Sequence, residues 1–556
     1  MFMYKRLVEA EDNALTIDIF ERSNKLGAGM PYSNCGSGDE HVTNVSGNEV
    51  PGIVSSVADW VKSAPAELLQ HHKISTANFN EYKVFPRLFF GRYLNGQFEL
   101  LLKKSKAKGQ ATKVHLNSEV ADIKDKPENE EVEVITCDGS AYLFDHVIIC
   151  TGHHWPVTHE GTVPNYFDSP YPPAKLALQI NYPIAIRGSS LTAIDAIRTL
   201  SRQNGCFSEL ENGMLGFKLN DESKLFKMVL HSRHGMLPAI RFHLEDSHLS
   251  KDAVLSREDV EKNMLENDGF LSLDYGFNEN FKKPIRENDP EMYELIKDLS
   301  LELFVDKMMA LREKLDAFTL FKAEYAEAEK SIKRRESVYW KEMLAVLSFA
   351  MNYPAKYFSA EDMLRLQKVL MPLISIVIAF VPQSSARELI ALYKAGVLEM
   401  VTLGEDGYVI PEEGGGAVIH FTDEQNIKHS VHYKLFVDSI GQPHLHYDQF
   451  PFKSLLKDKI ISSASVRYRS QQHGEAALLN KHERVIKSTN GDHYLQVPGI
   501  TINDHFQVVD SYGAMNPRIY IMAVPYISGY NPDYSGLDFC EAASAKIIQQ
   551  LLGNVN

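Results

Sequence analysis

The sequence predicts an α/β fold with parallel sheets and a separate helical insertion. Three observations lead to this prediction. Continuous apolar strands run directly into glycine turns, and over residues 182–200 such a turn opens a helix. Short alternating strands fill residues 113–150, and residues 246–375 combine helical spacing with many charges. The 556 residues are enough for two or three domains.

Composition and charge narrow the class of protein. The hydrophobic fraction of 44% is typical of globular domains, and the net charge of −15 disfavours a nucleic-acid partner. The most apolar run, Val369–Val381, is too short to span a membrane, and the chain opens without a signal-peptide pattern. The five scattered cysteines favour a reducing compartment. We therefore expect a cytoplasmic protein without a membrane partner.

The N-terminal stretch has the pattern of half a dinucleotide site. Helical spacing over Met1–Ala10 precedes an apolar strand, Ile17–Phe20, that ends on Glu21 and is followed by Gly27 and Gly29. An acid at the tip of the second strand of a βαβ unit binds a ribose hydroxyl. The first strand of such a unit and its G-x-G-x-x-G turn, which would precede the helix, are absent from this sequence.

A second glycine follows a buried strand at the end of residues 113–150. The alternating runs there predict a small antiparallel meander with a hairpin at Asp138-Gly139. The apolar strand Val147–Cys150 then ends in Thr151-Gly152. Ligands bind at the carboxyl ends of strands in open α/β sheets, although an ordinary turn also explains this glycine.

The clearest motif lies in Tyr182–Leu200. A buried strand, Pro183–Ile186, leads into a G-x-S-x-x-A turn in which Gly188 permits the tight turn and Ser190 keeps the backbone approachable. A helix follows, and its free amides suit a pyrophosphate. The pattern predicts a second dinucleotide site.

The strand after this motif, Lys227–Ser232, ends in Arg233. A basic residue at that tip contacts the 2′-phosphate of NADP, whereas an acid there favours NAD. The spacing from Gly188 is long, with Asn204–Lys224 as an expected loop insertion. A surface salt bridge is the alternative explanation for Arg233.

The remaining chain supplies fewer chemical signals. Met292–Phe321 has long helical periodicity, and the insertion either covers a substrate cleft or mediates assembly. His444 and His446 would share one face of an extended segment, but with no third ligand nearby we predict no metal site. A terminal helix, Gly536–Leu552, would point its N-terminus towards a bound cofactor.

Several segments together resemble a known family. IFERSNKLGAGMPYS, HVTNVSGNEVPG, FPRLFFGRYL, VIICTG and GSSLTAIDAI are similar to segments of the FAD/NAD(P)-binding family of bacterial flavoproteins, mostly presumed oxidoreductases. The resemblance covers about 240 N-terminal residues and resumes after residue 372 and in the tail. The family is similar in fold to N-hydroxylating flavin monooxygenases. Ala523-Val524-Pro525 departs from the strand-end glycine usual there.

The resemblance implies two Rossmann-like domains that bind FAD and NADP (or NAD). Residues 1–155 with 490–556 would form the FAD-binding domain, which is N-terminally incomplete in this sequence, and residues 156–245 with 376–441 the NAD(P)-binding domain. Residues 246–375 would be the helical insertion and residues 442–489 a connecting excursion.

The resemblance also implies roles for individual residues. The expected contacts on the FAD side are Glu21 to the adenosine ribose, Arg22, Gly27 and Gly29 beside the cofactor, Asn44 and Ser46 near the flavin, Arg87 near the pyrophosphate or flavin edge, Val120 to adenine through its backbone, and Thr151 and Gly152 closing the site. The expected contacts on the nicotinamide side are Gly188, Ser190, Thr192 and Arg233.

These implications favour an FAD-dependent oxidoreductase in which NAD(P)H reduces the flavin. No catalytic side chain is assigned, because the flavin carries the chemistry. A flavin N-monooxygenase acting on an amine and a non-catalytic dinucleotide-binding protein are the alternatives. The substrate or electron acceptor and the oligomeric state stay open.

Overall fold

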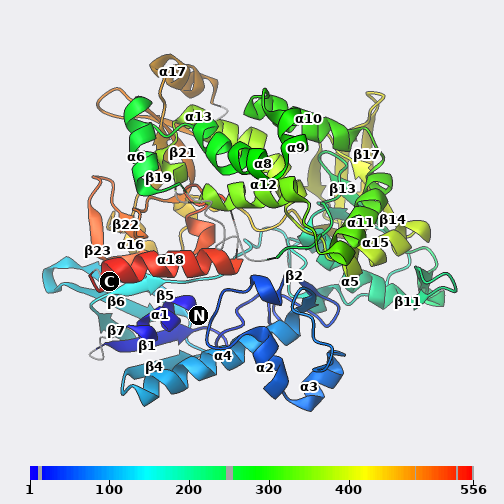
Figure 1. The fold of residues 1–556 in the computed structure, drawn as a ribbon, viewed down its shortest axis with the longest axis horizontal. Helices are drawn as coiled ribbons and strands as arrows, with labels where there is room; N and C mark the ends of the chain where they lie inside the picture. The colour runs from blue at the N-terminus through cyan, green and yellow to red at the C-terminus, as the bar shows by residue number, and fades with distance from the viewer. Residues whose placement is uncertain (11–14, 246–254, 353, 482–483, 534–535, 554–556) are drawn as a thin grey trace.

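The computed structural model describes residues 1–10, 15–245, 255–352, 354–481, 484–533 and 536–553. In Figure 1 the terminal helix α18 (Gly536–Leu551) lies between a layer of helices and the sheets of the N-terminal region. Nowhere in these described ranges is a helix both long and apolar enough to cross a membrane.

The N-terminal region is built around two parallel strands and one long helix. Strand β1 (Thr16–Glu21) pairs with β4 (Ala111–Leu116), and α4 (Arg87–Ala107) buries an aromatic face beside them. Its Phe89 and Phe90 are fully buried. The other elements before β4 are α1 (Phe2–Glu9), β2 (Val42–Ser46), η1 (Gly47–Glu49), α2 (Val57–Ser63), α3 (Ala66–His71) and β3 (Val84–Pro86).

Two further sheets connect this region to the tail of the chain. An antiparallel sheet contains β5 (Val120–Lys126), β6 (Glu131–Thr136) and β7 (Ala141–Phe144), with η2 (Pro127–Asn129) between the first two. Strand β8 (Val147–Ile149) pairs in parallel with β23 (Met515–Ile521), which also pairs with β22 (Gln507–Val509). Residues almost 400 positions apart are thus neighbours.

A five-stranded, fully parallel sheet forms the second α/β unit. Its order is β14 (Leu398–Thr402), β13 (Lys227–Ser232), β10 (Pro183–Arg187), β18 (Phe436–Asp438) and β9 (Tyr166–Phe167). Because the strands are parallel, their carboxyl ends lie along one edge. The remaining elements are η3 (Pro173–Leu176), α5 (Leu191–Asn204), β11 (Gly205–Glu209), β12 (Leu215–Leu219), η4 (Asp221–Ser223), α15 (Gln383–Lys394), β15 (Tyr408–Pro411), β16 (Ala417–Thr422) and β17 (Lys428–Tyr433).

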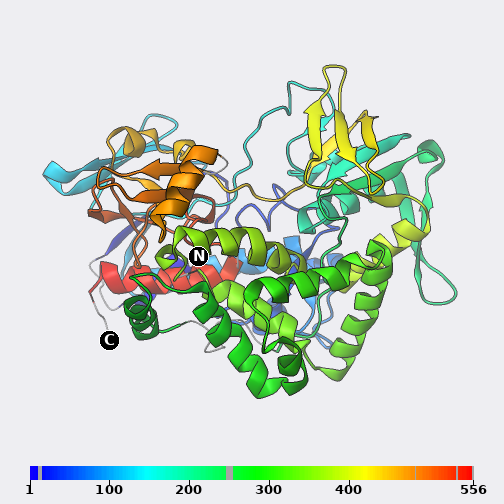
Figure 2. The ribbon, with the colours of Figure 1, turned by 90° about the horizontal axis from the view of Figure 1, so that it is seen from above.

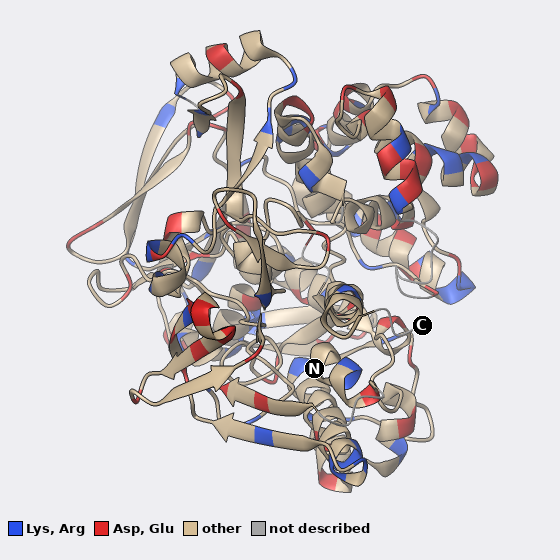
Figure 3. Cartoon of the chain, turned by 90° about the vertical axis from the view of Figure 1, so that its left-hand side faces the viewer, with Lys and Arg blue, Asp and Glu red and all other residues tan. Residues whose placement is uncertain are grey.

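Helices fill the chain between these strands. They are α6 (Arg257–Glu266), α7 (Leu273–Phe277), η6 (Asn278–Lys282), α8 (Lys283–Asn288), α9 (Pro290–Ile296), α10 (Leu301–Glu313), α11 (Ala317–Arg334), α12 (Tyr339–Ala350), η7 (Pro354–Tyr357), α13 (Ala360–Arg365), η8 (Leu366–Leu370) and α14 (Met371–Val377). In Figure 3, Lys and Arg positions alternate with Asp and Glu positions along helices of the chain.

The chain then forms another antiparallel sheet, seen in orange in Figure 2. Its order is β19 (Ser463–Arg467), β21 (His493–Ile500) and β20 (Val485–Lys487), so it spans the domain boundary expected at residue 490. The short helices nearby are η9 (Tyr447–Gln449), α16 (Lys453–Lys457), α17 (Gln471–Asn480) and η10 (Val524–Tyr526). One hydrophobic core joins this sheet, α18 and the helices of residues 255–378.

Two local expectations from the sequence are wrong. Residues 204–224 are not a loop, because β11 and β12 form a hairpin in which Phe207 and Phe217 pack with ring centroids 4.8 Å apart. Strand β4 joins β1 in parallel rather than the antiparallel meander. The periodic stretch 292–321 is helical, as expected, and is divided among three helices, since capping side chains at Ser300 and Asp316 start new ones.

Candidate functional site

The glycine turn after β10 lies at the carboxyl edge of the five-stranded sheet, as the motif predicts. Gly188 has φ +108°, and a Cβ there would lie 2.6 Å from the carbonyl oxygen of Ser439. Ser190 is the N-cap of α5, and its side chain makes no capping hydrogen bond. The first amides of α5 are therefore available to an anion, which is how a helix N-terminus binds a phosphate.

The loop after β18 connects this turn to the N-terminal region. Gly441 has φ +98°, and a Cβ there would lie 3.9 Å from Thr192 Oγ1. The side chain of Gln442 accepts a hydrogen bond from the His154 amide at 2.8 Å, and Trp155 Nε1 donates to the Gly441 carbonyl at 3.1 Å. The strand-end segments of the two α/β units therefore lie side by side.

Several of the predicted FAD-side residues lie at or just after strand ends, of β1, β5 and β8. Thr151 and Gly152 are exposed although they follow the buried residue Ile149. Glu21 ends β1 and accepts a hydrogen bond from the Ser23 amide at 2.7 Å, and Arg22 is exposed. Val120 begins β5, where it pairs with Thr136, and its backbone role toward adenine stays a prediction.

The two glycines after β1 differ in how closely other atoms approach them. Gly27 has φ +102°, and a Cβ there would meet the Leu94 carbonyl oxygen of α4 at 2.7 Å. Gly29 also has a positive φ, of +62°, but a Cβ there would make only an ordinary contact, with Pro31 at 3.8 Å. The close approach at Gly27 is thus to α4, and it fixes the loop that follows β1.

Gly27→Ala is expected to destabilise the N-terminal region strongly. The left-handed backbone costs about 1–2 kcal/mol for an L-residue, and the clash with α4 adds about 1–3 kcal/mol. The matched control is Gly139→Ala, since Gly139 has φ +85° and nothing within 4 Å of its Cβ position. Urea denaturation of both variants checks this, and equal losses would contradict the role of the α4 contact.

Arg87, predicted near the cofactor, forms a buried ion pair with a residue of the second α/β unit. Its Nη1 and Nη2 lie 2.5 and 3.1 Å from the two carboxylate oxygens of Asp195 on α5. Tyr171 donates its hydroxyl hydrogen to Asp195 at 2.6 Å, and His41 Nε2 lies 3.1 Å from the Asp195 carbonyl oxygen. The side chains of Arg87 and Asp195 are 14% and 6% exposed.

The charges of this cluster stabilise one another. Burial alone would raise the pKa of Asp195, but Arg87, His41 and the Tyr171 hydroxyl hold it below its usual value. Burial and the Asp195 charge raise the pKa of Tyr171. Burial lowers the pKa of His41, although Asp195 opposes that shift. Arg87 and Asp195 therefore form a charged pair at neutral pH.

A second buried cluster holds the segment that was predicted to lie near the flavin. Ser46 is fully buried and donates to Glu49 at 2.8 Å, while Arg241 Nη2 donates to Ser46 at 2.8 Å. Arg241 also forms an ion pair with Glu49 and donates to the Asn44 carbonyl oxygen. The position of Asn44 and Ser46 thus depends on an arginine almost 200 residues away.

Arg233 follows β13 at the same sheet edge as Gly188. Its side chain is 65% exposed, and its Nε lies 3.8 Å from a carboxylate oxygen of Glu405. This is the surface salt bridge considered as the alternative. Exposed pairs of this kind contribute little to stability, so Arg233 stays available to a phosphate.

Sequence reasoning missed the partners of these side chains. Asp195, Glu49 and Arg241 carry charge yet are buried. Asp195 gave one usable signal, since an acid between Ile194 and Ile197 interrupts an apolar helix face. Neither Glu49 nor Arg241 lies in a pattern that points to the other.

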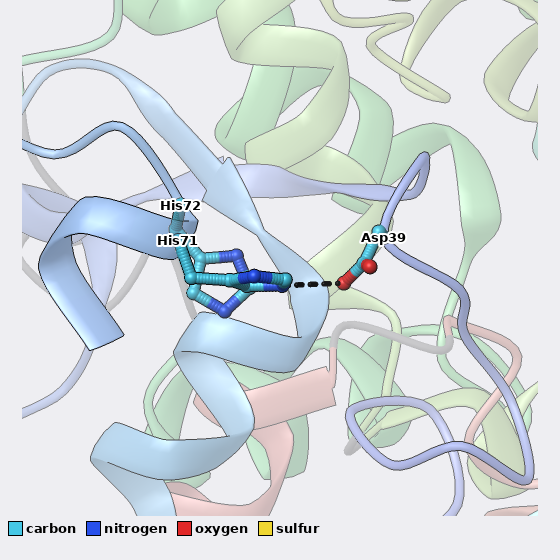
Figure 4. A group of neighbouring side chains, drawn as sticks. All are labelled: Asp39, His71 and His72. Carbon is cyan, nitrogen blue, oxygen red and sulfur yellow. Dashed lines mark hydrogen bonds and ion pairs between the residues drawn. The ribbon is translucent and has the colours of Figure 1, made fainter. Parts of the chain in front are cut away.

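One group of potential metal ligands occurs in the described ranges. The side chains of Asp39, His71 and His72 bring ligand atoms within 4.8 Å of one another (Figure 4). His71 Nε2 lies 3.2 Å from Asp39, and both side chains are more than half exposed. An exposed hydrogen bond accounts for the contact between His71 and Asp39. His444 and His446 are not joined there by a third ligand.

Comparisons with known proteins agree with this geometry. Residues 1–154 match the family model described as FAD-NAD(P)-binding. They form an FAD-NAD(P)-binding domain. Residues 256–378 match the model of the YdhS-like middle domain.

Similarity to a curated protein extends beyond this domain. The uncharacterized protein YdhS of Escherichia coli strain K12 is 26% identical over 452 residues, which are 80% of this chain and 82% of YdhS. Among solved structures, an ornithine N-hydroxylase of Kutzneria sp. 744 is similar with 11% identity and a TM-score of 0.45, over 99% of this chain and 95% of that one. The L-lysine 6-monooxygenase of Pseudomonas syringae is similar with 11% identity and a TM-score of 0.45, over 100% of this chain and 97% of that one.

Within the FAD-NAD(P)-binding domain, the predicted residues fall into two groups. His154 and Trp155, which follow Thr151 and Gly152 in the chain, contact the loop that contains Gly441, next to the turn at Gly188. Arg87 and Ser46 are instead held by buried charges that connect this domain to α5 and to Arg241. The second group fixes how the domain sits on the rest of the chain.

Proposed function

We propose that this protein is an FAD-dependent oxidoreductase in which NADPH reduces the flavin. The observation that carries the proposal is the direct contact between two strand-end segments, made by His154 with Gln442 and by Trp155 with Gly441. Open α/β sheets bind their ligands at such strand ends. A dinucleotide at each end would bring the two reactive rings together.

The residues on the nicotinamide side fit a dinucleotide phosphate. The uncapped amides at the start of α5 suit the pyrophosphate, and Gly188 permits the tight turn that precedes them. Arg233 would bind the 2′-phosphate, which favours NADPH over NADH.

On the other side, Glu21 at the end of β1 fits an adenosine ribose, with Thr151 and Gly152 forming the exposed floor of the site. FAD, when bound, would accept a hydride from the nicotinamide and pass electrons to an acceptor. The buried pairs Arg87–Asp195 and Glu49–Arg241 would fix the positions of the two sites relative to each other. They would also exclude water from the region where the two sites meet. None of these side chains has to act as a nucleophile.

Absorbance spectroscopy tests this proposal directly. The purified chain is mixed with FAD, freed of unbound FAD, and titrated anaerobically with NADPH or NADH. Retained flavin bands that bleach with NADPH support the proposal. A colourless protein after removal of free FAD contradicts it and favours a protein that binds a dinucleotide without turnover.

Product analysis in air separates the two catalytic alternatives. Hydroxylated amine formed in proportion to the NADPH consumed would identify a flavin N-monooxygenase. Oxidation that yields only peroxide with every amine tried would favour an electron acceptor other than O₂.

Arg233→Gln is expected to lower the preference for NADPH over NADH. Loss of a charge-assisted hydrogen bond of about 1.5–3 kcal/mol corresponds to at least about a tenfold change in the ratio of kcat/KM values. Glu405→Gln is the matched control, because it removes the partner of Arg233 and leaves the arginine in place. An unchanged ratio in Arg233→Gln would rule out this contact with the 2′-phosphate.

A further inference from the structure

Three side chains that can ligate a metal meet at the surface, between the end of α3 and the turn after Gly38. Figure 4 shows the rings of His71 and His72 beside one another, with the Asp39 carboxylate facing them. The three residues each bring a ligand atom within 4.8 Å of the other two. The hydrogen bond between His71 and Asp39 explains the approach of two of them, but it does not explain why His72 is there as well.

The end of α3 brings both histidines within reach of the same carboxylate. His71 is the last residue of the helix, and His72 is its C-cap, whose amide donates to the Leu68 carbonyl oxygen at 3.2 Å. Lys73 then has a φ of +54° and leads the chain away. The two imidazole rings are nearly perpendicular, with centroids 4.6 Å apart, and the His72 ring also packs on Phe89 of α4 at 5.7 Å. A fully buried residue therefore supports the ring of His72.

Asp39 lies in a turn that also contacts the second α/β unit. The Gly38 amide donates to His41 Nδ1 at 2.9 Å, and the His41 amide donates to the Gly38 carbonyl oxygen at 3.2 Å. His41 is buried, and its Nε2 lies 3.1 Å from the Asp195 carbonyl oxygen of α5. An ion bound by Asp39 would therefore connect α3 to the turn that contacts α5.

The donor set suits a divalent transition metal. Two imidazole nitrogens and one carboxylate oxygen are ligands of Zn²⁺ and similar ions, whereas Mg²⁺ and Ca²⁺ prefer oxygen ligands alone. In a tetrahedral zinc site with bonds of about 2.0–2.1 Å, neighbouring ligand atoms lie roughly 3.3 Å apart. His71 and Asp39 already have this separation, at 3.2 Å. Because both of these side chains are more than half exposed, they are free to close the remaining gap to His72.

The charged neighbours of the group permit a cation. The Asp39 carboxylate favours a positive charge at His72, whereas His71 and Arg92 of α4 oppose one. His71 would itself bind the ion as a neutral imidazole. Arg92 is exposed, so solvent and salt screen its repulsion, while the carboxylate would contact the ion directly.

We propose that Asp39, His71 and His72 bind one Zn²⁺ ion or a similar divalent transition metal, with water completing its coordination. The ion would join the end of α3 to the turn at Gly38 and so stabilise the contact of that turn with α5. None of the three ligands belongs to the residues predicted to bind FAD or NADP, and this site goes beyond the proposed redox function.

Equilibrium dialysis of the purified chain against Zn²⁺ at about pH 7.5 tests this proposal. Loss of a residue that only orients a metal ligand costs about 10–100-fold in affinity, so loss of a ligand should cost at least about tenfold. Asp39→Asn, His71→Gln and His72→Gln should each weaken binding of the tightest Zn²⁺ by that factor. The matched control is His429→Gln, since His429 lies 2.7 Å from Asp423 but belongs to no three-ligand group of the described residues.

Three results of the dialysis would overturn the proposal. The first is the absence of bound Zn²⁺ in the unaltered protein. The second is an unchanged zinc affinity in Asp39→Asn and His71→Gln, whose exposed side chains make both variants expected to fold normally. The third is displacement of Zn²⁺ by an equal concentration of Mg²⁺, which would indicate a site made of oxygen ligands.

Thermal denaturation gives an independent readout. An ion that binds only the folded chain stabilises it, so Zn²⁺ should raise the Tm of the unaltered protein and of His429→Gln. It should leave the Tm of Asp39→Asn nearly unchanged, and an equal rise in that variant would contradict the proposal. These measurements need neither FAD nor NADPH, so they are independent of the proposed redox function.

Discussion

Replacing Asp195 with asparagine is expected to lower the free energy of unfolding by about 3–5 kcal/mol, the usual loss when one partner of a buried ion pair is removed. The variant keeps the size of the side chain but leaves the Arg87 guanidinium buried without its counter-charge. Urea denaturation can be followed by tryptophan fluorescence, to which Trp155 contributes with its ring 5.1 Å from that of Tyr171. Glu405→Gln, in an exposed pair, should leave the transition unchanged.

The same prediction has a defined dependence on pH. The folded-state pKa of Asp195 lies below its unfolded value of about 3.9. Its contribution to stability is therefore complete above that value and is lost as the pH falls through the folded pKa. The difference between the unaltered protein and Asp195→Asn should shrink in acid once the pH falls below the unfolded value of Asp195, about 3.9. A difference that stays unchanged in this acid range would contradict a charged Asp195.

Local patterns were enough to predict the elements around both strand-end sites. The strand 227–232, the helix after Ser190 and the terminal helix from Gly536 all occur as expected. These elements are specified by residues close in sequence, through apolar spacing, a tight turn and a helix start. The pairing of β8 with β23 depends on residues far apart in the chain, so it has no local pattern.

Of the candidate site, the sequence alone predicted only those residues that the backbone conformation requires. Gly188 has a positive φ, and the backbone of Ser439 lies close to it. Both conditions favour glycine, which can be recognised in the sequence. Arg87 and Ser46 were assigned from a resemblance, whereas their partners come from distant segments. A buried ion pair needs two complementary charges in space, and one sequence does not show which charges meet.

Arg241→Met is the second variant for which we expect a large effect. The Arg241 and Glu49 side chains are 4% and 8% exposed, so the substitution leaves the Glu49 carboxylate buried without a counter-charge. It also removes the donors to Ser46 and to the Asn44 carbonyl oxygen. We expect a loss of about 3–5 kcal/mol in the free energy of unfolding. Thermal and urea denaturation measure it.

A double-mutant cycle separates the ion pair from the other contacts of Arg241. Glu49→Gln alone leaves Arg241 without its counter-charge, but combined with Arg241→Met it removes both charges, so the double variant should be less destabilised than the two single losses added together. The coupling free energy should reach about 1–3 kcal/mol, the upper part of the range for residues in contact. Additive losses would mean that the ion pair itself contributes nothing. Because Asn44 and Ser46 are the residues proposed to lie near the flavin, FAD affinity should fall in Arg241→Met and recover in part in the double variant. A stability loss without any change in FAD affinity would remove the 44–46 segment from the proposed flavin site and leave the buried pair as a structural contact between the two units.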